Sequence, residues 1–198
     1  DFSFLAPALT RAGITVAVPN YALCPAVTVA DIVRQMLQAT AWLYRNGGNF
    51  GAPRHSVYVA GHSAGGHLTA MMLAALWPSV ARDLPSRVVK AGFALSGVYD
   101  LHPIIDVASI NVDVRLDRAM ADKVSPVSYP PATDAPLYTC VGGDENQGFQ
   151  QQNALIGRKW KKVLKADIPC PGANHFTITH ELRDADGLLT RYLPLLLA

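Results

Sequence analysis

The sequence predicts a single α/β domain, in which a mostly parallel β-sheet is covered by helices on both faces. Short β-branched runs alternate with segments of helical periodicity along the 198 residues, and parallel strands need such crossover connections. One of these runs ends in a Gly-x-Ser-x-Gly turn that leads directly into a helical segment. Polar residues follow several other runs, at the sheet edge where the carboxyl ends of parallel strands gather reactive groups.

The amino-terminal part of the chain contains the first predicted strand and the first predicted helix. Residues 14–18 form a β-branched run that Pro19 ends, which predicts a buried strand. Apolar residues at helical spacing follow; Thr28 and Asp31 resemble a capping pair at their start, and Gly47 ends the pattern. We therefore expect a long helix with one apolar face.

The central part repeats the alternation of strand and helix. The apolar run 56–60 predicts a second strand, and the small-residue-rich segment 64–76 predicts a helix that begins almost at once. Residues 88–95 form a third strand-like run. Residues 99–136 are rich in Asp and Pro, so we expect a long irregular connection before the next strand.

The carboxyl-terminal part completes the predicted sheet. Residues 137–141 predict a fourth strand, and residues 149–164 have a helical pattern. A short fifth strand is expected at 167–170, followed by a loop and a helical tail over 182–197. Gly and Pro are spread along the chain and do not form a linker, so residues 1–198 are expected to form one domain.

Composition argues against several classes of protein. The chain is 50% hydrophobic and 16% charged, with a formal net charge of +2, and lacks the basic bias typical of nucleic-acid binding. No apolar run approaches the roughly 18 residues of a membrane span. Cys24, Cys140 and Cys170 lack the spacing of a metal site or a disulfide framework. We expect buried reduced thiols, a cytoplasmic location, no metal and no organic cofactor.

A nucleophile is predicted at the turn after the second strand. Residues 56–67 read S-V-Y-V-A-G-H-S-A-G-G-H: a strand, a sharp turn and a helix. Such a turn strains its central residue, so it needs small neighbours such as Gly61, Ala64 and Gly65. It lifts the Ser63 hydroxyl clear of the sheet, beside free N–H groups at a helix N-terminus. Ser63 is therefore the predicted nucleophile, and the Ala64 N–H is a predicted oxyanion donor.

A serine hydroxyl needs a base, and His175 is the best placed of the six histidines. It lies in the loop after the fifth strand, whereas His180 lies in or near the last helix and His55 precedes a strand. The acid should follow an earlier strand. Asp144 and Glu145 both follow the fourth strand, and position alone does not choose between them.

Other side chains near the strand ends are expected to surround this site. Asp100 follows the third strand and is a further candidate acid, although its position suits the cap of a turn better. His62 is adjacent to the nucleophile, and Tyr21, Tyr99 and His102 lie near strand ends. We predict that these four residues line the pocket, although each also suits a packing role.

Five short motifs, spread over nearly the whole chain, carry a family resemblance. They are N-Y-A-L-C-P at 20–25, G-H-S-A-G-G-H-L at 61–68, S-G-V-Y-D-L at 96–101, V-G-G at 141–143 and N-H-F at 174–176. Together they resemble the kynurenine formamidase branch of the α/β-hydrolases, which is similar to the hormone-sensitive lipase group of esterases. The resemblance implies a triad of Ser63, an acid and His175. It places the acid two residues after Gly143 and four before Phe149, which selects Glu145 over Asp144.

The resemblance also implies a segment that residues 1–198 do not match. The family carries a His-Gly-Gly motif after its third strand, which supplies part of the oxyanion hole. Residues 1–7 resemble the chain shortly after that motif. The family's third strand would lie between the strands at 14–18 and 56–60. A sheet with that gap would leave buried strand edges unpaired, so we expect the 198-residue chain to be N-terminally incomplete.

The expected activity is hydrolysis of a small acyl ester or of a formamide such as N-formylkynurenine, through an acyl-enzyme. A small-acyl carboxylesterase would use the same residues. A non-catalytic, ligand-binding homologue is another alternative, because a fold does not determine activity. The expected partner is a small-molecule substrate, without nucleic acid or membrane, and a homodimer is left open.

Overall fold

The sheet has four parallel strands in a computed structural model that describes residues 3–183, 187–188 and 190–192. The strands are β1 (Val57–His62), β2 (Val89–Leu95), β3 (Leu137–Gly142) and β4 (Leu164–Cys170), and they lie side by side in this order. All three strand pairs are parallel, which confirms the predicted type of sheet. Their carboxyl ends therefore meet at one edge.

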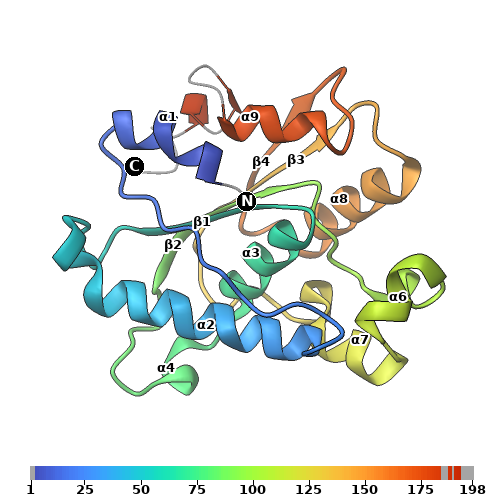
Figure 1. Ribbon diagram of the computed structural model, residues 1–198, viewed down its shortest axis with the longest axis horizontal. Helices are drawn as coiled ribbons and strands as arrows, with labels where there is room; N and C mark the ends of the chain where they lie inside the picture. The colour runs from blue at the N-terminus through green and yellow to red at the C-terminus, as the bar shows by residue number, and fades with distance from the viewer. Residues whose placement is uncertain (1–2, 184–186, 189, 193–198) are drawn as a thin grey trace.

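Helices cover both faces of the sheet (Figure 1). In the described residues they are α1 (Ala6–Arg11), α2 (Val29–Asn46), α3 (Ala64–Ala74), α4 (Trp77–Val80), α5 (His102–Ile105), α6 (Ala108–Val114), α7 (Arg118–Val124), α8 (Gln147–Lys159) and α9 (His180–Arg183), with 3₁₀ turns at Ser3–Leu5, Gly47–Phe50, Pro126–Ser128 and Thr177–Thr179. One core contains Ala41 of α2, Leu73 of α3 and Ile156 of α8. On the opposite face, Leu9 of α1 and Ile178 join a second core.

Helix caps set the bounds of the two longest surface helices. The side chain of Thr28 accepts from the Asp31 N–H (3.2 Å), and the Thr28 N–H donates to the Asp31 carboxylate (2.9 Å), which confirms the predicted capping pair. The Asn146 side chain caps α8, so that helix begins two residues earlier than predicted. It also ends earlier, at Lys159, because Leu164 already belongs to β4.

The predicted strand at residues 14–18 is wrong. The segment belongs to no strand or helix, and Val18 is 49% exposed. A β-branched run becomes a strand only when a neighbour completes its hydrogen-bond ladder. Within the described residues, β1 pairs only with β2, so no neighbouring strand reaches this segment.

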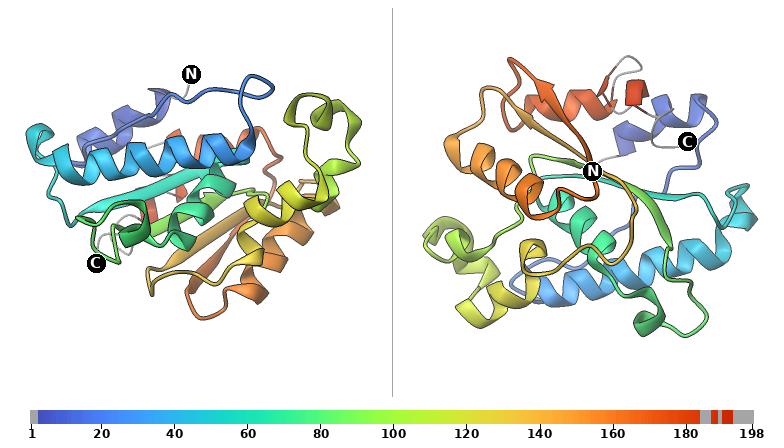
Figure 2. Two further views of the ribbon diagram at one scale, coloured as in Figure 1. Left: turned by 90° about the horizontal axis from the view of Figure 1, so that it is seen from below. Right: turned by 180° about the vertical axis from the view of Figure 1, so that it is seen from behind.

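The connection at residues 99–136 is more regular than predicted, because it contains α5, α6 and α7. The Asp117 side chain accepts from the Met120 N–H (2.7 Å) and caps α7, and Pro103 lies in the first turn of α5. Asp and Pro therefore start helices here. The three helices form a lobe at one side of the sheet (Figure 2), around a small core of Leu101, Leu116, Ala121 and Val124.

The remaining expectations have mixed outcomes. Cys140 and Cys170 are buried free thiols as predicted, and burial raises the pKa of both, but Cys24 is only half-buried. His180 begins α9, while most of the helical tail expected over 182–197 lies outside the described residues. In the part of the chain that the structure describes, no helix is long and apolar enough to cross a membrane.

Candidate active site

Ser63 lies at a sharp turn between β1 and α3. Its φ of 56° and ψ of −116° are unusual for a residue other than glycine. Its N–H donates to the Leu95 carbonyl (2.9 Å), and its own carbonyl accepts from the His67 N–H (3.1 Å). The end of β2 and the first turn of α3 thus hold the strained residue, and such strain persists only where its surroundings impose it.

Two glycines make this turn sterically feasible. A Cβ on Gly61 would lie 2.3 Å from the backbone of Gly65, and one on Gly66 would lie 2.7 Å from the Cα of Gly97. Both distances are shorter than real Cβ contacts. At Gly65, by contrast, a Cβ would meet nothing within 4 Å. Glycine is therefore required at positions 61 and 66, whereas position 65 has room for a Cβ and does not require glycine.

His175 faces Ser63 from the loop after β4. Its Nε2 lies 3.1 Å from Ser63 Oγ, and its Nδ1 lies 2.7 Å from Glu145 Oε2. With the ring proton on Nδ1, shared with the carboxylate, Nε2 is free to accept the Ser63 hydroxyl proton. The Asn174 side chain shapes this loop by accepting from the Phe176 N–H (2.9 Å).

Three aromatic rings pack against the His175 imidazole. Phe149 of α8 stacks on it with a centroid distance of 4.0 Å, the His62 ring lies at 4.6 Å, and Phe176 meets it edge-on at 5.8 Å. Burial, together with the neighbouring His175, lowers the pKa of His62. His62 therefore favours its neutral form near pH 7, so His175 is not required to take a proton beside another cation.

Glu145, and not Asp144, is the carboxylate in contact with His175. Its side chain is fully buried, and its Oε1 accepts hydrogen bonds from the Gly142 N–H (2.8 Å) and from the Ser96 hydroxyl. Asp144 is exposed. Adjacent side chains in a turn diverge, so only one of the two reaches His175.

Sequence reasoning missed two groups that hold Glu145. Ser96 directly follows β2, and Gly142 ends β3. A Cβ on Gly142 would lie 2.2 Å from the Ala173 carbonyl oxygen, so only glycine lets β3 approach the His175 loop this closely. The same rule that located His175, that reactive groups gather at the carboxyl ends of parallel strands, could have found both.

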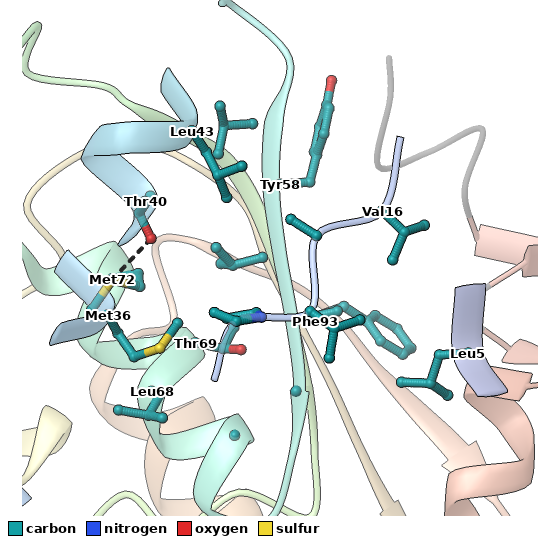
Figure 3. A pocket seen from close by; sticks show the side chains of 18 of the residues that line it. Leu5, Val16, Met36, Thr40, Leu43, Tyr58, Leu68, Thr69, Met72 and Phe93 are labelled. Atoms are coloured by element: carbon teal, nitrogen blue, oxygen red, sulfur yellow. Dashed lines mark hydrogen bonds between the residues drawn. The ribbon is translucent and has the colours of Figure 1, made fainter. Parts of the chain in front are cut away.

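A mainly apolar cavity of about 520 Å³ is lined by Ser63 and by β1 (Figure 3). Figure 3 shows side chains of α2 and α3 on one side of β1 and those of the amino-terminal segment on the other: Met36, Leu43 and Leu68 against Leu5 and Val16. The cavity lies along an edge of β1 that pairs with no other described strand. It is therefore found between residues 14–18 and 57–60, where the family resemblance places a further strand.

The four predicted pocket residues separate into two groups. Tyr21 and His62 line the cavity together with Ser63. Tyr99 and His102 do not, so this prediction is wrong for them: Tyr99 is fully buried in the core, and His102 pairs with Asp100 (2.7 Å) at the surface. A position near a strand end does not determine which way a side chain points. Asp100, the further candidate acid, is engaged by His102 and does not contact His175.

Comparison with known proteins gives consistent relatives. The chain matches a family model described as alpha/beta hydrolase fold over residues 3–160. It is 26% identical to the kynurenine formamidase of Salmo salar, covering 98% of this chain and 66% of that protein. It is 31% identical to the kynurenine formamidase of Drosophila melanogaster, covering 93% of this chain and 63% of that protein. The chain therefore spans just under two thirds of the length of these relatives.

Solved structures with the same fold are also similar. The crystal structure of a putative thioesterase from Silicibacter sp. has a TM-score of 0.82 and 29% identity, over 96% of this chain and 67% of that chain. An esterase from Pyrobaculum calidifontis has a TM-score of 0.71 over 98% of this chain and 70% of that chain, and at 17% identity it supports the fold alone. By the match over residues 3–160, the parallel sheet and the turn at Ser63, the chain belongs to the α/β-hydrolase fold family.

Proposed function

We propose that Ser63, His175 and Glu145 form a catalytic triad that hydrolyses a small acyl ester or a formamide through an acyl-enzyme. The observation that carries the proposal is the continuous set of contacts from Ser63 Oγ to His175 Nε2 (3.1 Å) and from His175 Nδ1 to Glu145 Oε2 (2.7 Å). A nucleophile, its base and an orienting acid within hydrogen-bond reach are what acyl transfer requires.

The mechanism follows from these contacts. His175 Nε2 takes the hydroxyl proton as Ser63 Oγ bonds to the carbonyl carbon, and the carbonyl oxygen becomes an oxyanion. The Ala64 N–H begins α3 and lies at its positive end, where helix N–H groups lack intrahelical acceptors, so it suits one oxyanion donor. His175 then passes its proton to the leaving amine or alcohol as the bond to the acyl carbon breaks. Glu145 stabilises the imidazolium that forms on the way.

Hydrolysis of the acyl-enzyme completes the cycle. Water gives a proton to His175 as its oxygen attacks the acyl carbon. His175 then returns this proton to Ser63 Oγ as the bond from Oγ to the acyl carbon breaks, which releases the acid and restores Ser63. For a formyl group the acid released is formate. Similarity to kynurenine formamidases over nearly the whole chain supports a formamide such as N-formylkynurenine. A small-acyl ester or thioester is the second candidate, supported by the 29% identity to the putative thioesterase.

A fluorophosphonate probe tests the triad. We expect the probe to label the protein at Ser63 and the label to be lost in Ser63→Ala. Ser56→Ala is the matched control, because Ser56 is exposed and precedes β1 at the opposite end of that strand. It should label like the wild type. Absence of labelling in folded wild-type protein would instead favour a ligand-binding role.

A comparison of three substrates tests the bond that is cleaved. The substrates are N-formylkynurenine, formanilide and phenyl acetate, and the readout is kcat/KM. A formamidase should cleave both formamides, whereas an esterase should cleave phenyl acetate alone. Turnover of formanilide but not of N-formylkynurenine would support the formamide bond and reject kynurenine as the recognised group.

A further inference from the structure

Ser96 lies between the nucleophile and the acid. It directly follows β2, the strand between β1 and β3. The residue is 0% exposed, and its N–H donates to the Cys140 carbonyl (2.8 Å), which ties it to β3. Its φ is 48°, in the left-handed region that residues other than glycine seldom adopt. The chain thus holds a buried, strained serine at the edge of the sheet where the triad assembles.

The Ser96 hydroxyl donates a hydrogen bond to Glu145 Oε1. The same oxygen accepts the Gly142 N–H (2.8 Å), while Oε2 contacts His175 Nδ1 (2.7 Å). The two carboxylate oxygens therefore differ in their partners: one is held by fixed donors, and the other faces the base. A fully buried carboxylate is stable only when it is paired and hydrogen-bonded, and Ser96 supplies one of these bonds.

The backbone conformation at Ser96 is further evidence for the importance of its hydroxyl. Glycine adopts a left-handed φ without steric cost, whereas any residue with a Cβ is strained there. Glycine would therefore serve better if this position only had to turn the chain after β2. A side chain is needed only to carry a donor to Glu145. The hydrogen bond to Glu145 thus offsets the backbone strain at Ser96.

We propose that Ser96 is a positioning residue of the triad: its hydroxyl fixes Glu145 so that Oε2 stays directed at His175, and it stabilises the negative charge of the carboxylate. The inference rests on the proposed function, since Ser96 acts through Glu145 on the same proton transfer. Its role differs from a purely structural one in a measurable way, because it changes how tightly the pair of Glu145 and His175 holds a proton.

The sign of this effect follows from the hydrogen bonds. Without the Ser96 hydroxyl, Oε1 of the carboxylate keeps only the Gly142 N–H. A carboxylate with fewer donors binds a proton, or a neighbouring imidazolium, more tightly. Glu145 then holds the His175 imidazolium more tightly, so His175 becomes neutral at a higher pH. The acid limb of the activity profile therefore moves to higher pH.

Other titratable groups face the pair from neighbouring strands. They are His62 at the end of β1 and Cys170 at the end of β4. Burial lowers the pKa of His62 and raises that of Cys170, so both favour their neutral forms near pH 7. Asp144 is adjacent in sequence but exposed. A shift seen on removing the Ser96 hydroxyl is therefore assigned to Glu145 and His175.

The test compares Ser96→Ala and Ser96→Gly with the wild type. Both variants remove the hydroxyl, and the glycine variant also relieves the strained φ, so it protects the test against misfolding. The matched control is Ser125→Ala, because Ser125 is also 0% exposed and its hydroxyl accepts from the Leu101 N–H (2.8 Å) in the helical lobe. The readouts are kcat and KM for phenyl acetate from about pH 5 to 9, and the NMR titration of the His175 imidazole.

Both Ser96 variants should lose about 10- to 100-fold in kcat, with KM within about threefold of the wild type. The acid limb and the NMR midpoint should move up by about half to one pH unit, and Ser125→Ala should move neither. Unchanged midpoints in both Ser96 variants, or an equal shift in Ser125→Ala, would overturn the inference. If the wild type neither turns over ester nor reacts with the fluorophosphonate, the proposed function fails, while the NMR titration still decides the role of Ser96.

Discussion

Gly142→Ala is the substitution whose effect the structure defines most sharply. The new Cβ would lie 2.2 Å from the Ala173 carbonyl oxygen, whereas real Cβ contacts essentially never fall below 3.0 Å. The end of β3 and the His175 loop must therefore separate by at least about 0.8 Å. Because Ala173 is two residues before His175, this shift takes His175 Nε2 out of hydrogen-bond reach of Ser63 Oγ, now at 3.1 Å.

The expected loss can be estimated from this displacement. A misplacement of about 1 Å in a catalytic group costs about 100-fold in rate, and overpacking of this kind costs about 1–3 kcal/mol of stability. The assay is the rate of fluorophosphonate labelling together with kcat/KM for phenyl acetate. Gly48→Ala is the control, because a Cβ there would meet nothing within 4 Å. Labelling of Gly142→Ala within about threefold of the wild type would refute the reasoning.

Three other predictions concern charge. Glu145→Gln should lower kcat by about 10³–10⁴-fold, because the amide no longer stabilises the His175 imidazolium; steady-state kinetics measures this. Burial lowers the pKa of His67 from 6.5 to about 4, so between about pH 6.5 and pH 4 the unfolded chain binds this proton more than the folded chain does. Urea denaturation should then show a loss of about 3 kcal/mol between pH 7 and 4 that is absent in His67→Gln. Hydrogen bonding to Asp100 raises the pKa of His102. The stability that this hydrogen bond contributes is therefore complete below pH 6.5 and is lost as the pH rises through the raised pKa. The free energies of unfolding of the wild type and of His102→Gln, measured by urea denaturation, should converge at high pH.

Each of these predictions has a matched control. Asp144→Asn removes the exposed neighbouring carboxylate and should keep near-wild-type kcat. Equal losses of kcat in Asp144→Asn and Glu145→Gln would contradict the choice of Glu145 as the acid. His55→Gln changes an exposed histidine and should leave the pH dependence of stability intact. If the free energy of unfolding of His67→Gln falls between pH 7 and 4 as steeply as that of the wild type, the argument for His67 is contradicted. If the difference in stability between the wild type and His102→Gln grows with pH, the argument for His102 is contradicted.

The strand, turn and helix around Ser63 are local features, and the sequence alone predicts them. Their signals, an apolar β-branched run, small residues and the start of a helical segment, all lie within about a dozen neighbouring positions, so no contact with a distant segment is needed to recognise them. The location of His175 also follows from sequence, because the carboxyl ends of parallel strands share one edge whatever the details of packing. Family resemblance then adds Glu145, between two adjacent carboxylates that position alone leaves equivalent.

Tertiary structure decides whatever depends on contacts between distant segments. Residues 14–18 have the composition of a strand but lack a paired neighbour among the described residues, so their pattern is not sufficient. The burial of Glu145, the hydrogen bond from Ser96 to its Oε1 and the tight contact between Gly142 and the His175 loop each depend on segments that are distant in sequence. A sequence records which groups are available, whereas the direction of each side chain is set by how the strands and loops pack against one another.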